Sequence, residues 1–487
     1  MTMLDIINGC FSTGDSYIPV SELYDRWENA SGYLPEAFFQ NELRLLQENG
    51  SIIIENQNVY LTGVWQQEEF VAEQLSARLL APPIPAVQLP DIVTAGGITL
   101  EEGQKKAVEM ALNNRLSLIL GGAGTGKTTL IQAIIGYTDS HVVLCSPTAK
   151  AAINLSLRTG ITAATIHRTL GVPRDGSFAE TTPLNGTDAI IIDEAGMLTL
   201  EMLAGLLKAA PQDCRIVLVG DDNQLPPVGV GHVLRDLAAL PVPCVRLKRN
   251  HRQIQTAGAL HQNITRFEAI HSLSDLAFDE SFSLYSGPDC IADLAQTAAK
   301  LYQNGTSVQV IAPRNDDVNL LNRRIQSLLN PMPKNKLFAV HGKTVFVDGD
   351  RVVISRNDPV RGCFNGENGV LSITESGITV ALNNGRKAYW VKAEIDNGLN
   401  EIALGYAITT HKSQGSEYDI VLLYVTPCNR YLLTRRLMYT AISRARKRLI
   451  LYGDPATIDR VLSTDPVPRR TFLVSKTRAK LCEFESS

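Results

Sequence analysis

Short apolar runs alternate with amphipathic helical segments over residues 98–250. Almost every residue is hydrophobic in the runs LSLIL, HVVLC, AIIID and RIVLVG, which is typical of parallel strands covered on both faces. A second alternating region begins near residue 307 with SVQVIAP and continues with IVLLYV and LILYG. We therefore predict an α/β fold with two parallel-sheet domains, one at 98–250 and one built from 251–334 and 401–465.

The pattern changes between the two halves of the second domain. Residues 335–400 contain short β-rich runs separated by Gly and Asn turns, among them TVFVDGDRVVIS, GVLSI and KAYWVK. This pattern predicts a small β-barrel inserted into the second domain.

Residues 1–80 are predicted to form a separate unit. Apolar residues at helical spacing end at Gly50, and the next run, SIIIENQNVYL, has the pattern of a β-hairpin. Helices followed by a hairpin are typical of a winged-helix module, and a proline-rich linker over 81–97 would join it to the rest. We expect this unit to be dispensable for the activity of the remainder, so that a chain starting near Thr94 still folds.

Composition describes an ordinary globular protein. The 487 residues are 44% hydrophobic and 20% charged. The sequence contains no apolar run of about 18 residues or more, so we expect no membrane span. The N-terminus lacks the pattern of a secretory signal, and the eight cysteines have no paired metal spacing. These features favour reduced thiols and a cytoplasmic location, in the bacterial cytosol or nucleoid.

Charge is unevenly distributed although the net charge is only −4. Residues 1–100 contain 13 Asp/Glu and 3 Lys/Arg, whereas residues 430–480 contain 3 and 13. The acidic start favours a protein partner or simple packing over DNA contact. The basic region, with a basic C-terminal tail at 466–487, is either a phosphate-binding track or a solvated charged face.

The strongest chemical signal is GGAGTGKTT at residues 121–129, between the strand LSLIL and the helix LIQAII. It fits the phosphate-loop pattern GxxxxGK[ST] in the strand–loop–helix context that the pattern requires. Backbone N–H groups of such a loop surround the phosphates of ATP, Lys127 neutralises phosphate charge, and Thr128 is placed to bind Mg²⁺. The expected contacts come from Gly122, Ala123, Gly124, Thr125, Gly126, Lys127, Thr128 and Thr129.

Two further polar clusters follow buried strands. Asp193 and Glu194 end the strand AIII, where Asp193 would lie by the metal and Glu194 by an attacking water. The segment GDDNQLPP follows RIVLV, and its Gln224 could sense the γ-phosphate. Alternatively, each segment could simply begin a helix or form a turn.

The order of DEAGML, GDDNQLPPVGVG, THKSQGSEYD and YTAISRARKRLILYGD resembles superfamily-one helicases, and most nearly RecD and its free-standing relatives. The resemblance covers nearly all of 30–455. It implies two RecA-like motor domains, and it identifies the β-rich insert at 335–400 as similar to the family's SH3-like barrel. Only 25 residues lie between His167 and Asp193, so this interval is too short for a large insertion.

The resemblance also implies roles for individual residues. Gln104 would read adenine, Gln414 and Glu417 would contact the nucleotide, and Arg252 and Arg444 would act as arginine fingers. Hydrolysis would depend on Lys127, Thr128, Asp193, Glu194 and Gln224, with Thr128 and Asp193 holding Mg²⁺. Arg444 is followed by Arg446, Lys447 and Arg448, so a basic helix face is the alternative interpretation.

Single-stranded DNA and forked duplex are the expected substrates. The family's DNA face would include Thr148, His167, Thr410 and His411, whose hydroxyls and rings suit phosphates and bases. No histidine metal cluster or nuclease carboxylate cluster is evident, so we expect no cleavage activity. The alternatives are an RNA helicase of the same superfamily and an ATPase subunit of a larger DNA-repair complex.

The resemblance favours movement 5′→3′ along the bound strand. Two features carry this expectation: room only for a small hairpin near 171–187, and a compact barrel instead of a long helical insertion before THKSQG.

Overall fold

The computed structural model forms two compact units. One unit comprises Met1–Gly121, Gly126–Leu247 and Val467–Ser487, and the other comprises Gly122–Thr125 and Lys248–Pro466. The structure describes residues 2–32, 34–82, 84–90, 94–95, 97–138, 141–172, 178, 180–249, 258–331, 337–358, 360–427 and 433–485.

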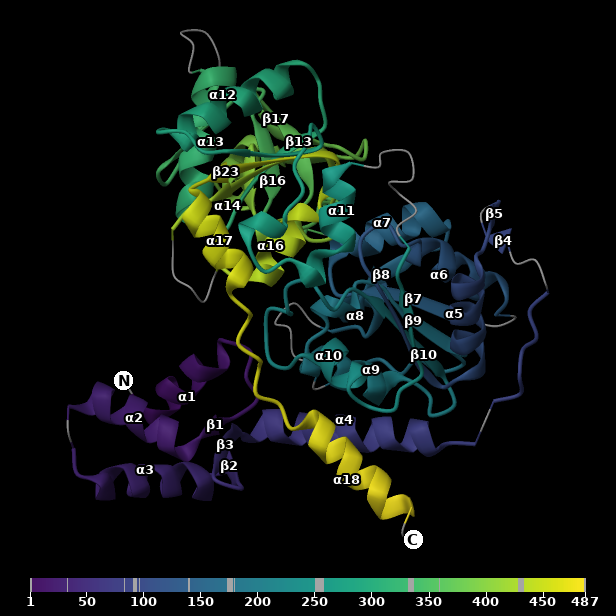
Figure 1. Cartoon of the computed structure of the whole chain (residues 1–487). Coiled ribbons are helices and arrows are strands. Elements are labelled where there is room, and N and C mark those ends of the chain that lie inside the picture. Colours follow the sequence, from purple (N-terminus) through teal and green to yellow (C-terminus); the bar gives the residue numbers. More distant parts are fainter. Residues whose placement is uncertain are drawn as a thin grey trace. The chain divides into compact units, whose positions relative to one another are not determined.

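The first unit is built on a six-stranded parallel sheet (Figure 1), as the apolar runs predicted. The strand order is β11-β6-β10-β9-β7-β8. In that order the strands span Cys244–Leu247, Leu116–Gly121, Arg215–Gly220, Ala189–Ile192, Val142–Ser146 and Ala163–Thr165. Since all six strands are parallel, the loops after β6, β9 and β10 emerge at the same edge of the sheet.

Alternate residues of these strands enter two different cores. Leu118 and Ile190 pack with helices on one face, whereas Ile119 and Ile191 pack with helices on the other. The second face is covered by α5, α6 and α7 (Glu102–Asn113, Lys127–Gly136 and Ala149–Thr159). The first face is covered by α4, α8, α9 and α10 (Thr62–Leu80, Ile166–Thr169, Leu200–Ala209 and Val233–Ala238).

The N-terminal module, defined here as residues 2–61, has its own small core around Ile7, Leu23, Trp27 and Phe39. Helix α3 and the β2–β3 hairpin occur where the sequence predicted a helix and a hairpin. The module consists of α1, β1, α2, α3, β2 and β3, at Met3–Phe11, Ile18–Pro19, Val20–Ser31, Glu36–Glu48, Ile52–Glu55 and Asn58–Leu61. Its sheet has the order β1-β3-β2 and is antiparallel.

Helix α4 packs against the first parallel sheet, although a domain boundary was expected at its end, residue 80. Its side chains Val71, Ala72 and Leu75 are fully buried in the same core as Leu118 and Ile190 of the motor sheet. The expectation that residues 1–80 are an independent module therefore does not fit the structure, because a chain starting near Thr94 would lose part of the motor core.

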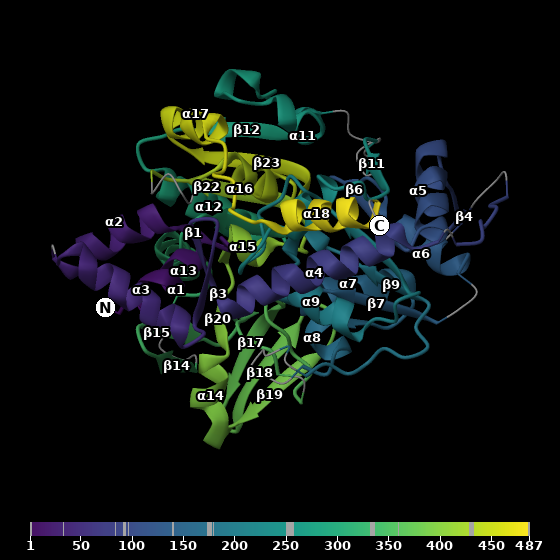
Figure 2. The same cartoon turned by 90° about the horizontal axis from the view of Figure 1, so that it is seen from below.

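The C-terminal residues are not a free basic tail. Residues 467–485, named here the C-terminal strap, end in helix α18 (Leu473–Glu485), which lies across α4 (Figures 1 and 2). Leu473 is buried in the motor core. Lys476 approaches Glu69 at 3.0 Å and lies over the Trp65 ring, 4.5 Å from its centroid. Part of the basic charge thus pairs with the acidic N-terminal region.

The second unit has a five-stranded parallel sheet of order β12-β23-β22-β13-β21. These strands span Phe282–Tyr285, Ala445–Gly453, Tyr418–Val425, Val308–Ala312 and Ala407–Thr409. Helices α12 and α13 (Cys290–Gln303 and Asn315–Leu329) share a core with this sheet. Helices α11 and α16 (Ala259–Thr265 and Arg435–Ile442) also contact its strands, and α17 (Pro455–Ser463) packs on α16.

The insert forms a five-stranded antiparallel sheet of order β19-β18-β17-β16-β20. It extends to residue 404 rather than 400, because β20 pairs with β16. A separate hairpin, β14–β15, spans Phe338–His341 and Thr344–Val347. The five strands are Lys387–Val391, Gly377–Leu382, Asn368–Thr374, Arg351–Ile354 and Ile402–Leu404, and α14 (Ile395–Asn400) precedes β20.

One expectation concerns residues that the structure describes only in part. Of the small hairpin expected near 171–187, residues 173–177 and 179 lie outside the described residues, and the described residues 180–187 form no strand. Among the described residues, no helix is long and apolar enough to span a membrane.

We expect Leu75→Ala to destabilise the first unit by about 2–5 kcal/mol, because the truncation leaves a cavity between α4 and the parallel sheet. Leu80→Ala, at the 41% exposed end of the same helix, should change stability by less than about 0.5 kcal/mol. Urea unfolding followed by circular dichroism measures both variants. Equal shifts of the midpoint would contradict the assignment of α4 to the motor core.

Candidate functional site

The phosphate loop joins β6 to α6 at the carboxyl edge of the first parallel sheet. β6 ends at Gly121 and α6 begins at Lys127. Gly124 and Gly126 have φ of 81° and 83°, values that L-residues rarely adopt, so the loop can curl only because glycine occupies these positions. The loop is closed by the Thr125 hydroxyl, which donates to the Gly122 carbonyl at 3.0 Å.

Lys127 and Thr128 occupy the first turn of α6. The Lys127 ammonium donates to the Gly121 carbonyl at 2.5 Å, which holds the cation beside the end of β6. The positive end of the α6 dipole adds to this charge. The arrangement is suited to a polyphosphate.

Asp193 and Glu194 directly follow β9, two strands away from β6 in the sheet. The Asp193 carboxylate accepts from the Glu194 N–H at 2.9 Å. Burial and the neighbouring Glu194 raise the pKa of Asp193 to about 6, against the opposing effect of Lys127. Glu194 has a φ of 54°, a strained conformation for a residue with a side chain. Such strain is typical of positions that must present a side chain to a ligand.

The segment after β10 supplies the third cluster, between β6 and β9 in the sheet. Gln224 is buried, and its amide group donates to the Asp221 carboxylate at 3.3 Å. Asp222 forms a bidentate ion pair with Arg246 of β11, with N···O distances of 2.7 and 2.8 Å. The structure therefore brings the three predicted groups of the first motor domain to one edge of the sheet.

The other predicted residues of this unit have local roles as well. The Gln104 side-chain oxygen accepts from the Glu101 N–H at 3.1 Å and caps α5. Thr148 caps α7 by accepting from the Ala151 N–H at 3.3 Å. The His167 ring lies 4.8 Å from the ring of Phe178, and burial lowers its pKa.

In the second unit, Arg444 is buried and bonded within its own domain. Its guanidinium donates to the Thr440 carbonyl at 3.0 Å and to the Ser416 carbonyl at 3.3 Å. Glu417 accepts from Arg446 at 3.2 and 3.3 Å, and Gln414 is buried. Arg252 lies outside the described residues.

The predicted DNA contacts of this unit differ in exposure. Thr410 is fully buried, so its hydroxyl is less available to a ligand than the sequence suggested. His411 is partly exposed, and burial lowers the pKa of His411 and of Lys412. Both side chains follow β21 on the short helix α15 (Thr410–Ser413).

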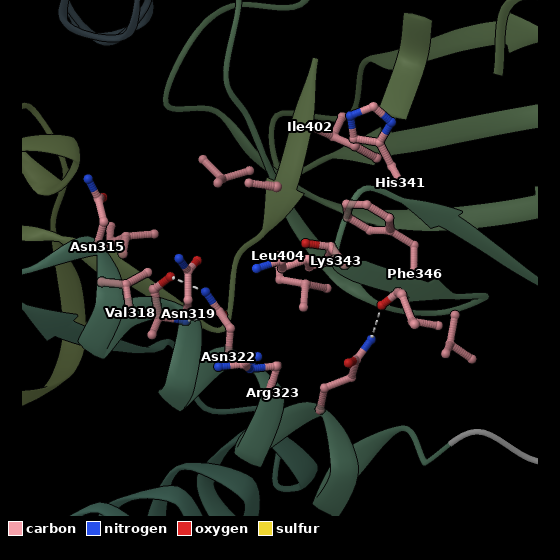
Figure 3. Close-up of a pocket in the computed structure, with 18 of the residues that line it drawn as sticks. Asn315, Val318, Asn319, Asn322, Arg323, His341, Lys343, Phe346, Ile402 and Leu404 are labelled. Atoms are coloured by element: carbon pink, nitrogen blue, oxygen red, sulfur yellow. Dashed lines mark hydrogen bonds between the residues drawn. The ribbon is translucent and has the colours of Figure 1, made fainter. Parts of the chain in front are cut away.

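A pocket of about 840 Å³ lies within the second unit beside Lys412. Figure 3 shows Asn315, Asn319 and Arg323 of α13 on one side and His341 and Lys343 of the β14–β15 hairpin on the other. Gln326 of α13 donates to the Val345 carbonyl at 2.9 Å, which ties the hairpin to the helix. The lining combines amide groups with three cations and a single Asp, so it suits an anionic ligand with hydrogen-bonding groups.

Sequence reasoning missed this pocket. A signal was present, because Asn315, Asn319, Asn322, Arg323 and Gln326 recur at the helical spacing of one face of α13. Amide side chains along one face of a helix indicate a surface that binds polar groups. The facing wall of the pocket comes from the β14–β15 hairpin, and the sequence does not show that this hairpin packs against α13.

Two family models match the chain. An AAA domain matches residues 99–277, and a UvrD-like helicase C-terminal domain matches residues 404–452. Both ranges contain the strands and polar clusters described above.

Several curated proteins are similar over most of the chain. An ATP-dependent RecD2 DNA helicase of Deinococcus radiodurans is 31% identical over 86% of this chain and 59% of its own length. The RecBCD enzyme subunit RecD of Mycolicibacterium smegmatis is 30% identical over 82% of this chain and 79% of its own length. The chain thus spans less than two thirds of the first relative and most of the second.

The fold has counterparts among solved structures. A Pif1 helicase from Bacteroides, in complex with ADP-AlF3 and ssDNA, is 18% identical with a TM-score of 0.51. The similarity covers 79% of this chain and 98% of that chain. At this identity the likeness concerns the fold.

A phosphate loop and strand-end carboxylates on a parallel sheet, with a second parallel sheet in the same chain, define a P-loop protein with a RecA-like motor core. Within that class, the chain belongs to the RecD family, as the identity to RecD over 79% of that protein's length shows.

We expect Lys127→Ala to weaken binding of Mg·ATP at least about tenfold, because the variant removes a charge-assisted contact to phosphate. Lys106→Ala is the matched control, since Lys106 is exposed on α5 and pairs only loosely with Glu102 at 3.6 Å. Titration with a fluorescent ATP analogue measures both. Wild-type affinity in Lys127→Ala would argue against this loop as the nucleotide site.

Proposed function

We propose that this protein is an ATP-dependent DNA helicase that moves 5′→3′ on single-stranded DNA and separates duplex ahead of it. The observation that carries the proposal is the gathering of Lys127, Asp193, Glu194 and Gln224 at one sheet edge in a chain of the RecD family. Two similar proteins, an ATP-dependent RecD2 DNA helicase and a Pif1 helicase in complex with ssDNA, support DNA as the track.

In this proposal Glu194 is the general base of ATP hydrolysis. It would accept the proton of the water that attacks the γ-phosphorus, so that the products are ADP and phosphate. Lys127 would hold the phosphates, and Gln224 would orient the water or contact the γ-phosphate. The hydrogen bond from Gln224 to Asp221 supports a fixed orientation for its amide group.

Mg²⁺ fits the oxygen donors of this edge. Asp193 has a raised pKa beside Glu194, and a divalent cation would relieve the repulsion between the two carboxylates. Thr128 and Asp193 would hold the ion, which supplies charge neutralisation at the phosphates when it is bound.

Arg252 and Arg444 are proposed as arginine fingers that stabilise the charge of the transition state. Arg444 would have to exchange its bonds to the Ser416 and Thr440 carbonyls for a phosphate oxygen. Gln414 and Glu417 are proposed to contact the nucleotide, as is Gln104 for the adenine. An arginine that engages only in the ATP-bound state links hydrolysis to domain movement.

The DNA track is proposed to include the pocket beside α13. Arg323, Lys343 and Lys412 would contact phosphates, and the amides of Asn315 and Asn319 would contact phosphate or sugar oxygens. Thr148 and His167 of the first unit and His411 of the second are proposed as further DNA contacts, whereas the buried Thr410 would act through its backbone or by positioning α15.

RNA could replace DNA as the track, and comparing ATPase stimulation by deoxy- and ribo-oligonucleotides separates the two. The chain could also serve as the ATPase subunit of a larger repair complex, as the name of the RecBCD relative suggests. The acidic N-terminal module could then bind a protein partner, and the expected location is the bacterial cytosol or nucleoid.

We expect Glu194→Gln to bind Mg·ATP normally but to lower DNA-stimulated turnover by about 10²–10⁴-fold, because the shape of the site survives and the base does not. Glu73→Gln, on the exposed face of α4, should hydrolyse like the wild type. Phosphate release at saturating DNA measures the rates. Robust turnover by Glu194→Gln would remove Glu194 from the mechanism.

Polarity is tested with forked and tailed duplexes in single-turnover unwinding at saturating ATP. We expect unwinding of a duplex with a 5′ single-stranded tail and little of one with only a 3′ tail. The compact antiparallel insert at β16–β20 supports this expectation. An equal or reversed preference would contradict the direction but leave the ATPase proposal standing.

A further inference from the structure

The loop at residues 225–231 connects the Gln224 cluster to α10 and is held by a residue from the far end of the chain. The Arg469 guanidinium donates to the carbonyls of three alternate residues of this loop, Pro227, Gly229 and Gly231, at 2.6, 2.8 and 2.7 Å. Three charge-assisted bonds from one planar group fix the loop backbone more tightly than a single contact could.

The N-terminal module holds the same loop from another side. The Gly231 N–H donates to the Gly14 carbonyl at 2.9 Å. Gly14 also packs so closely on Arg469 that a Cβ at this position would overlap the guanidinium. The Val230 side chain contacts both the module core and the motor core, and its carbonyl accepts from the Leu200 N–H at 3.0 Å.

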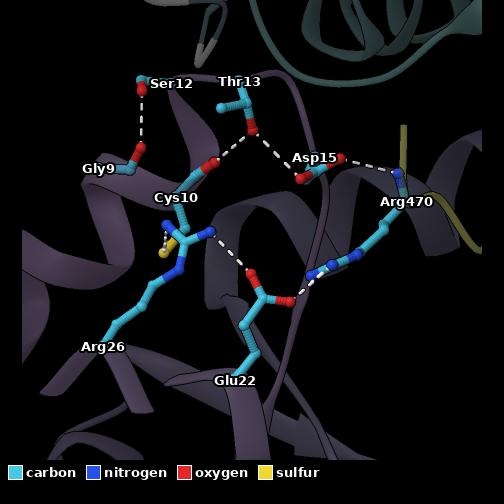
Figure 4. A network of polar contacts seen from close by, with 8 residues as sticks. All are labelled: Gly9, Cys10, Ser12, Thr13, Asp15, Glu22, Arg26 and Arg470. Carbon is cyan, nitrogen blue, oxygen red and sulfur yellow. Dashed lines mark hydrogen bonds and ion pairs between the residues drawn. The ribbon is translucent and has the colours of Figure 1, made fainter. Parts of the chain in front are cut away.

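The three residues that directly follow Arg469 anchor the strap to the N-terminal module and to α10. Figure 4 shows Arg470 paired with Glu22 at 2.6 Å, while its backbone N–H donates to Asp15 at 2.9 Å. The Thr471 hydroxyl donates to Asp236 at 3.0 Å, and the Phe472 ring stacks on Tyr17 with centroids 4.6 Å apart. Arg469 is therefore held at a fixed place over the loop.

The restraint on the loop begins three residues after Gln224. Leu225 and Pro226 separate Gln224 from Pro227, the first loop residue that Arg469 contacts. Each of the two prolines fixes its own φ and restricts the residue before it. Since this stretch has few free torsions, a displacement of the Pro227 carbonyl moves the backbone of Gln224. The Gln224 amide is itself buried and bonded to Asp221.

We propose that Arg469 is a positioning residue for Gln224, acting through the 225–231 loop, and that the N-terminal module and C-terminal strap thereby set the geometry of the ATPase site. This inference rests on the proposed role of Gln224 in ATP hydrolysis. It assigns the basic strap a function in turnover and not in binding DNA.

The test compares Arg469→Ala and Arg469→Lys with Arg478→Ala in the full chain. Arg478 is the matched control, since it lies on the same strap and donates to the Ala239 carbonyl at 2.8 Å, away from the loop. Steady-state hydrolysis is measured with saturating oligo-dT, together with thermal unfolding. Loss of positioning should lower kcat about tenfold in Arg469→Ala, with the KM for ATP changed less than about threefold.

Arg469→Lys should recover part of the lost kcat, because an ammonium can still donate to one or two of the carbonyls. Arg478→Ala should keep kcat within about twofold of wild type. If Arg469→Ala keeps wild-type kcat, or if Arg478→Ala loses as much kcat at the same thermal midpoint, the inference is overturned. If the wild type itself shows no DNA-stimulated hydrolysis, the proposed function fails instead.

Hydrogen exchange tests the inference without relying on activity. Peptides that cover residues 221–231 should exchange faster in Arg469→Ala than in wild type and in Arg478→Ala. Faster exchange confined to 227–231, with no change at 221–225, would show that the loop does not transmit the restraint to Gln224 and would overturn the inference.

Discussion

Helix α4 and the strap helix α18 are packed together against one face of the first parallel sheet, and the organisation of the first unit depends on this packing. Val71 and Leu75 of α4 and Leu473 of α18 share a core with Leu118 and Ile190 of the sheet. Their burial removes a continuous apolar surface from water, the main favourable contribution to folding. Because α4 extends from the N-terminal module and α18 from the strap, the same core brings both close to the 225–231 loop.

The sequence was most informative where one signal had a single structural solution. Continuous apolar runs such as Leu116–Gly121 are typical of parallel strands covered on both faces, so both parallel sheets and seven of their eleven strands were predicted. The short strands β8, β11, β12 and β21 carry no such run and were not predicted. The order of the helicase motifs was equally restrictive and led to the RecD family. The GxxxxGK[ST] pattern between a strand and a helix likewise predicted the phosphate loop.

Boundaries and long-range partners were harder to predict. Helix α4 has polar residues around most of its surface, and nothing in its spacing tells whether Leu75 faces the module or the motor sheet. Arg469 and Lys476 belong to a basic stretch that is compatible with a solvated tail, because their carbonyl and carboxylate partners are hundreds of residues away. The pocket beside α13 was missed for a similar reason, since its other wall comes from the hairpin that contains Lys343.

The strap also determines when the first unit can be completed during synthesis. The residues that pair with Glu22 and Glu69 are Arg470, Lys476 and Lys480, and roughly 220 residues of the second unit are synthesised before them. At about 5–20 residues per second, the ribosome needs on the order of 10–45 s for that interval. During this time the apolar face of α4 that α18 will cover is open to solvent or to chaperones. The second unit, apart from four residues of the phosphate loop, is continuous in sequence and can fold first.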